Sequence, residues 1–152
     1  QKIAEAIEPS FFEKRGRLIP PVEKGQLQLD FGLWEDPKHS VSLVHKGHFY
    51  QTVPEEKVRS VAEGQVQFAQ SLPGLAMTVV IDHGDHYYTV YSHMRKLLVD
   101  EGESVEAGQL VGEVGLHTIR KWPGVYFEIR HFSQALDPAL WLQKPSVLRA
   151  QL

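Results

Sequence analysis

Residues 122–131 read WPGVYFEIRH, and apolar and polar side chains alternate along this stretch. The apolar set is Val125, Phe127 and Ile129, and the polar set is Tyr126, Glu128 and Arg130. Because successive side chains of a β-strand point to opposite faces of a sheet, the alternation predicts a strand with one apolar face and one polar face.

Short strand-like runs separated by turn residues surround this stretch. They are residues 58–70, 77–84, 87–94 and 99–115, and the sequence Gly84-Asp85-His86 is a hairpin signal between the second run and the third. Many short strands with frequent turns are typical of an all-β sandwich or barrel. The sequence therefore predicts an all-β fold.

The two ends of the chain differ from this pattern. In residues 1–17, Ile3, Ile7 and Phe11 recur at helical spacing, which predicts a short helical arm or the end of an upstream helix, although Pro9 would kink a continuous helix. The domain itself is expected over residues 18–143, with Trp141 near its end filling the core, and residues 144–152 are expected to be a C-terminal tail.

Composition limits the classes of function. A chain of 152 residues is long enough for one domain with a core of its own. A formal charge of −3 gives no reason to expect a nucleic-acid partner. The absence of cysteine excludes disulfides and thiolate metal sites, and no apolar run approaches the roughly 20 residues of a membrane span.

Several segments resemble, in order, those of the LytM (lysostaphin-type) family of zinc endopeptidases, which cut peptidoglycan cross-links. These segments are HKGHF (45–49), VRSVAEGQVQFA (58–69), VVIDHGDHYYTVYSHM (79–94), ESVEAGQLVGEVG (103–115), VYFEIR (125–130) and LDPALWL (136–142). The resemblance implies a LytM-like antiparallel β-sandwich, to which the sequence adds the short helical N-terminal arm.

The resemblance also implies that the family's metal site is degenerate in this chain. His45 stands at the first zinc-ligand position and His93 at one catalytic histidine position, so both are retained. Phe49 and Tyr126 stand at the other two ligand positions, and Gly124 replaces the second catalytic histidine. Catalytic zinc normally needs three protein ligands, so no zinc cofactor and no enzyme activity are expected. His117, in the loop before the last strand, is the alternative source of a ligand.

In the LytM family the metal site lies in a groove on one face of the sheet, and without the metal this groove is expected to serve binding. The residues expected to form a partner-binding groove are His45, Lys46, Phe49, Tyr91, His93, Tyr126, Glu128 and Arg130. Alternation along a strand predicts that Tyr91 and His93 share the groove face. Three plainer interpretations stay open: Phe49 fills the space of the metal, Tyr126 forms a hydrogen bond to His93 or His45, and Arg130 is a solvated edge charge.

Degenerate LytM domains of the EnvC and NlpD type bind and activate cell-wall amidases, and VYFEIR looks like the EnvC type. The resemblance therefore implies a non-catalytic activator of a peptidoglycan hydrolase in the periplasm or cell envelope, with the helical arm covering the groove until activation. Its partner would be an amidase-type hydrolase or an active LytM enzyme, with peptidoglycan as a further ligand. The alternatives are a zinc endopeptidase with unusual ligands and a structural module that binds peptidoglycan or a cell-shape scaffold.

Overall fold

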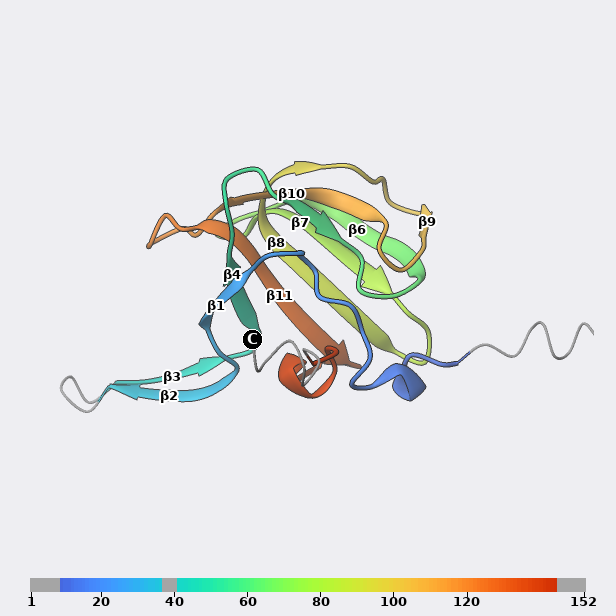
Figure 1. The fold of residues 1–152 in the computed structure, drawn as a ribbon, viewed down its shortest axis with the longest axis horizontal. Helices are drawn as coiled ribbons and strands as arrows, with labels where there is room; N and C mark the ends of the chain where they lie inside the picture. The colour runs from blue at the N-terminus through green and yellow to red at the C-terminus, as the bar shows by residue number, and fades with distance from the viewer. Residues whose placement is uncertain (1–8, 37–40, 145–152) are drawn as a thin grey trace, which may run out of the picture.

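The computed structural model describes residues 9–36 and 41–144, and for residues 33–36 and 41–44 it describes the backbone only. Twelve strands and two 3-10 turns make up the described part (Figure 1). The strands are β1 (Gln26–Leu29), β2 (Gly32–Asp36), β3 (Val41–His45), β4 (His48–Gln51), β5 (Lys57–Arg59), β6 (Gly64–Leu72), β7 (Ala76–Asp82), β8 (Tyr87–Leu97), β9 (Ser104–Val105), β10 (Leu110–Leu116), β11 (Pro123–His131) and β12 (Gln134–Leu136). The turns are η1 (Phe12–Lys14) and η2 (Pro138–Leu140).

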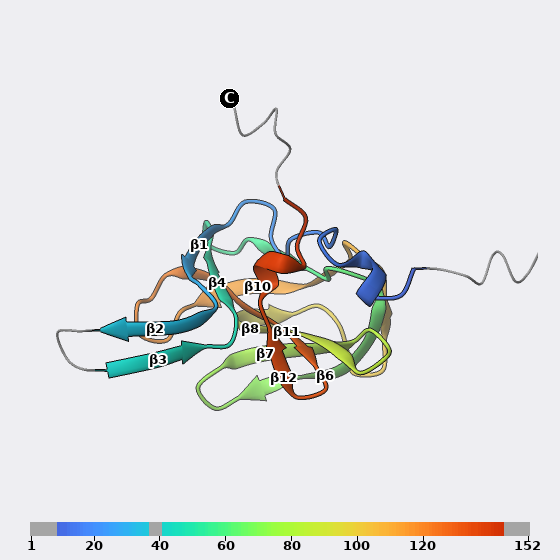
Figure 2. The same cartoon turned by 90° about the horizontal axis from the view of Figure 1, so that it is seen from below.

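The predicted antiparallel all-β fold is confirmed. Ten strands form one sheet, which runs β1-β4-β11-β10-β8-β7-β6-β9, with β12 beside β11 and β5 beside β10. The C-terminal part of β11 pairs directly with β8, from Tyr126↔Ser92 to His131↔Tyr87. β2 and β3 form a separate hairpin that extends away from this sheet (Figures 1 and 2).

The core lies on one face of the long strands, and alternation explains which residues enter it. Val125, Phe127 and Ile129 of β11 are fully buried, as the pattern predicts. Val58 of β5 and Val111 of β10 are buried in the same cluster, so these strands close over the core face of the longer ones. The opposite face of β7, β8 and β11 remains open for a site.

Only residues 9–17 of the predicted N-terminal arm lie within the described part of the chain. Residues 9–17 contain only the 3-10 turn η1, which ends because Arg15 is extended with ψ of 126° and Gly16 has a φ of +84°. Residues 1–8, with Ile3 and Ile7, lie outside the described residues. Phe11 packs into the core cluster against Tyr87 and Trp141, at ring distances of 5.1 and 5.2 Å. This part of the arm therefore lies on the core face and does not cover the open face.

The C-terminal segment is fastened to the N-terminal one. Trp141 is 4% exposed, which confirms that it fills the core. Its carbonyl oxygen accepts hydrogen bonds from the backbone N–H groups of Gly16 and Leu18. Of the tail predicted at residues 144–152, only Lys144 lies within the described residues.

Candidate functional site

A groove of about 510 Å³ lies on the open face of β7, β8 and β11. Cross-strand pairing builds its floor, because Glu128 is opposite Val90 and Arg130 is opposite Tyr88. Directly paired residues of neighbouring strands point to the same face, so the side chains of both strands converge here. Val80 of β7 extends the apolar part, and His93 and His117 also line the groove.

Tyr126, Glu128 and Arg130 form a hydrogen-bonded row along the groove face of β11. The Tyr126 hydroxyl donates to one carboxylate oxygen of Glu128 at 2.5 Å, and the Arg130 Nε donates to the other at 2.6 Å. Burial, followed by the adjacent Glu128 carboxylate, raises the pKa of Tyr126 well above its usual value of about 10. The phenol therefore keeps its proton, which is held by Glu128. We call these three residues the polar row.

His93 reaches the groove through a β-bulge, which corrects one sequence prediction. Met77 pairs with Met94 and Val79 pairs with Tyr91, so Thr78 alone lies opposite both Ser92 and His93. His93 has a φ of +62°, in the left-handed region. The extra residue shifts the alternation of side chains by one position. His93 and Tyr91 consequently do not share a face.

Tyr91 points into the core and does not line the groove. It is fully buried, and its ring lies 5.3 Å from that of Phe127. Its hydroxyl accepts a hydrogen bond from the Val61 N–H at 3.1 Å and lies 2.9 Å from the Thr89 hydroxyl. These contacts satisfy the buried phenol, which is a structural role.

Phe49 fills the space beneath the groove. It is fully buried, and its ring lies 5.0 Å from His117 and 6.1 Å from His93. A Cβ atom at Gly124 would lie 2.7 Å from the Phe49 ring and 2.1 Å from the Tyr50 carbonyl oxygen. Gly124 and Phe49 thus interlock, with a ring on β4 occupying the room that a side chain on β11 would need.

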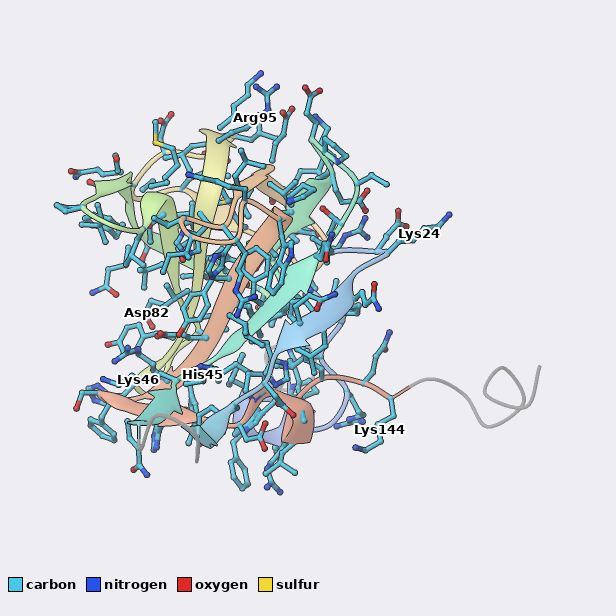
Figure 3. All side chains as sticks on the ribbon, turned by 90° about the vertical axis from the view of Figure 1, so that its left-hand side faces the viewer. Lys24, His45, Lys46, Asp82, Arg95 and Lys144 are labelled. Carbon is cyan, nitrogen blue, oxygen red and sulfur yellow. The ribbon has the colours of Figure 1, made fainter. Side chains whose placement is uncertain are left out.

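His45 and Lys46 lie outside the lining of this groove, at the end of β3 (Figure 3). The His45 Nδ1 is 2.9 Å from the Asp30 carbonyl oxygen, and Lys46 is exposed. The structure therefore brings together five of the residues that the sequence singles out. These are His93, His117, Tyr126, Glu128 and Arg130.

The groove residues do not fit a catalytic zinc ion. Phe49 has no lone pair, and the Tyr126 proton is engaged by Glu128. The His117 Nδ1 accepts backbone N–H groups of Arg120 and Ile119 at 3.0 and 3.2 Å, so the proton of the neutral ring is on Nε2. Burial and then Arg120 lower the pKa of His117, which keeps that ring neutral.

His93 is then the one imidazole of the described groove with a nitrogen available to a metal. Its Nδ1 is buried without a hydrogen-bond partner, and burial, followed by His117, lowers its pKa. A single ligand does not hold a catalytic zinc ion, which takes three protein ligands. The arrangement instead presents an apolar floor with one polar row.

The apolar floor is a part of the site that sequence reasoning missed. Val80, Tyr88 and Val90 face the groove, next in sequence to core residues such as Val79 and Tyr87. The signal was present in the sequence, because VV at 79–80 and YY at 87–88 place apolar side chains on both faces of a strand.

This fold and groove define the class of LytM-like β-sheet domains. Residues 43–138 match Peptidase family M23, and the chain belongs to this family. No helix among the described residues is long and apolar enough to cross a membrane.

Relatives within the family include both an activator and peptidases. The chain is 37% identical over 86 residues to Murein hydrolase activator EnvC of Escherichia coli, covering 57% of the chain and 20% of EnvC. It is 30% identical over 136 residues to Peptidoglycan DD-endopeptidase ShyB of Vibrio cholerae, covering 84% of the chain and 32% of ShyB. A crystal structure of a zinc-containing peptidase from Vibrio cholerae matches with a TM-score of 0.74 at 25% identity, covering 85% of the chain and 41% of that structure. The chain therefore spans a third or less of the two curated relatives.

Proposed function

We propose that this domain is a non-catalytic activator of a murein hydrolase. Its groove receives a segment of an amidase-type enzyme in the cell envelope, and binding of that segment switches the enzyme on during cell-wall remodelling or division. The partner enzyme carries out the cleavage of peptidoglycan. The likeness to EnvC supports the activator role, and the proposal extends it from that relative to this chain.

The observation that carries this proposal is the polar row beside an apolar floor in one groove. Tyr126, Glu128 and Arg130 are tied to one another, and Val80 and Val90 extend an apolar floor beside them. A groove of about 510 Å³ with an apolar lining and a few fixed polar groups has the character of a binding site. Arg130 is partly exposed, so its guanidinium can donate to the carbonyl or carboxylate groups of a docked segment.

The experiment is a reconstituted activation assay with envelope amidases and dye-labelled peptidoglycan. The wild-type domain should increase dye release by the amidase. In the double variant Arg130→Ala with Tyr126→Ala, the domain concentration needed for half-maximal dye release should rise at least about tenfold, as expected when two anchor residues are removed from an interface. Arg17→Ala, at an exposed arginine outside the groove lining, is the matched control and should keep full activation. Activation that survives the double substitution would place the interface elsewhere.

The second candidate function is that of a peptidoglycan endopeptidase, which the similarity to ShyB supports. If the domain itself cleaves peptidoglycan cross-links, purified muropeptides should be cut without any partner, and a chelator should abolish the cleavage. Under the proposal, no cleavage occurs with or without added zinc. Binding to purified peptidoglycan without either activity would identify a structural wall-binding module.

A further inference from the structure

A second polar cluster lies away from the groove and joins three distant segments of the chain. Asp30 follows β1, His48 begins β4, and Asp137 precedes η2. The potential ligand atoms of these residues all lie within 4.8 Å of one another. The His48 Nε2 is 3.0 Å from the Asp30 Oδ1 and 3.8 Å from the Asp137 Oδ1.

His48 is the member of this cluster that points to a ligand. Its side chain is 3% exposed, and its Nε2 has no hydrogen-bond partner among the described atoms, although the Asp30 oxygen is at bonding distance. The ring is oriented so that an N–H at Nε2 would not point at that oxygen. A buried ring nitrogen thus lies close to two carboxylates without a well-aligned hydrogen bond to either.

Tyr50 supplies the second nitrogen of this ring with a partner. The His48 Nδ1 lies 2.7 Å from the Tyr50 hydroxyl. An Nδ1–H donated to that oxygen leaves the Nε2 lone pair facing the two carboxylates. Metal-binding histidines are commonly oriented in this way, with one nitrogen on the ion and the other donating to a neighbour.

Hydrogen bonds from the backbone hold the two carboxylates in position. The Asp30 Oδ1 accepts from the Phe31 N–H at 2.7 Å, and the Asp137 Oδ1 accepts from the Ala139 N–H at 3.0 Å. Asp30 is well exposed and Asp137 is partly exposed, so an ion can enter from solvent.

We propose that Asp30, His48 and Asp137 form a binding site for one divalent cation of the Zn²⁺ or Mn²⁺ class. Imidazole with two carboxylates suits these ions, and two negative charges balance the ion. Two ligand atoms that each lie about 2.1 Å from one ion are about 3 to 4 Å apart, and the His48 Nε2 is 3.0 Å from Asp30 and 3.8 Å from Asp137.

Such an ion would be structural, because it ties the turn after β1 to β4 and to the segment before η2. It is also separate from the groove. His48 is opposite Phe127 in the sheet, on the other side of β4 from Phe49. The inference therefore does not depend on the proposed activator function.

The test is a calorimetric titration of the tag-free, chelator-treated 152-residue chain with Zn²⁺ and with Mn²⁺ at neutral pH. One ion should bind per chain, and the Tm should rise with ion concentration. Asp30→Asn and Asp137→Asn should each weaken this binding at least tenfold. Asparagine also accepts the backbone hydrogen bond, so both variants are expected to fold.

His93→Asn is the control for the groove, since asparagine tolerates the left-handed backbone at that position. It should bind the ion with wild-type affinity. The proposal is overturned if neither ion binds saturably, if both aspartate variants keep wild-type affinity, or if His93→Asn removes the binding site.

Discussion

His83 is held as a neutral imidazole by its surroundings. Its Nδ1 lies 2.7 Å from the Glu63 carbonyl oxygen and its Nε2 lies 2.7 Å from the Thr89 hydroxyl. The ring stacks on Phe11 at 4.6 Å. Burial lowers the pKa of His83 to about 4, against 6.5 in an unfolded chain. Between pH 4 and pH 6.5, His83 is therefore neutral in the folded protein and protonated in the unfolded chain.

Because the pKa of His83 is lower in the folded state than in the unfolded chain, the free energy of unfolding depends on pH. Above pH 6.5 both states are neutral at this position and the stabilisation is fully present, and it is lost as the pH falls from 6.5 towards 4. The loss is at most about 3 kcal/mol of the free energy of unfolding, at 1.36 kcal/mol per pKa unit. The pKa values of His48, His93 and His117 are lowered too and act in the same direction.

We expect His83→Gln to be less stable than wild type at pH 7 and to lose less stability between pH 7 and pH 4.5. Urea unfolding at the two pH values measures both differences. His86→Asn, which replaces an exposed histidine in the same hairpin, should lose as much stability as wild type does. An equally steep loss in His83→Gln would show that His83 does not contribute to the pH dependence.

Single residues also show where sequence reasoning succeeds. Tyr126, Glu128 and Arg130 were placed on one face by alternation, and their hydrogen bonds confirm that placement. Tyr91 was assigned to the wrong face, because one extra residue at the bulge shifts the alternation between Tyr91 and His93. The positive φ of a histidine is a property of the backbone that no periodic pattern reveals.

At the scale of elements, the strands were more predictable than the N-terminal arm. The pattern of 87–94 and the turn at Gly84 predicted the β7–β8 hairpin. The spacing of Ile3, Ile7 and Phe11 predicted a helix, and of these three only Phe11 lies among the described residues. There it directly precedes η1 and packs against Trp141, a long-range contact that no local pattern predicts.

The contacts of the arm lead to a prediction about its two adjacent phenylalanines. Phe11 is 4% exposed and Phe12 is 58% exposed. Phe11→Ala should lower the free energy of unfolding by about 3 kcal/mol or more, because a buried aromatic ring is removed from the core. Phe12→Ala should cost less than about 1 kcal/mol. Equal losses in urea unfolding would contradict the docking of Phe11.

Across the whole molecule, the core and the groove lie on opposite faces of the sheet. One face carries the core and the other carries the groove, and neighbouring residues of one strand belong to different faces. Val79 is fully buried in the core, and Val80 lines the groove. The same substitution at these two positions therefore tests the division directly.

Val79→Ala should lower the free energy of unfolding by about 2 kcal/mol and leave amidase activation per folded molecule unchanged. Val80→Ala should cost less than about 1 kcal/mol but weaken activation, because it removes part of the groove floor. Urea unfolding and the dye-release assay provide the two measurements. If both variants lose stability and activation together, the two faces do not act separately.

The interlock of Gly124 with Phe49 limits which side chains position 124 can hold. A histidine there would place its Cβ 2.1 Å from the Tyr50 carbonyl oxygen and 2.7 Å from the Phe49 ring. That single change would destabilise the protein before any ion could bind, and so would trimming Phe49 first, since this would open a cavity. A histidine at position 124 is therefore compatible with this fold only if β4 and β11 repack together. Two compensating substitutions, one on each strand, would be needed to place a side chain at this position without loss of stability.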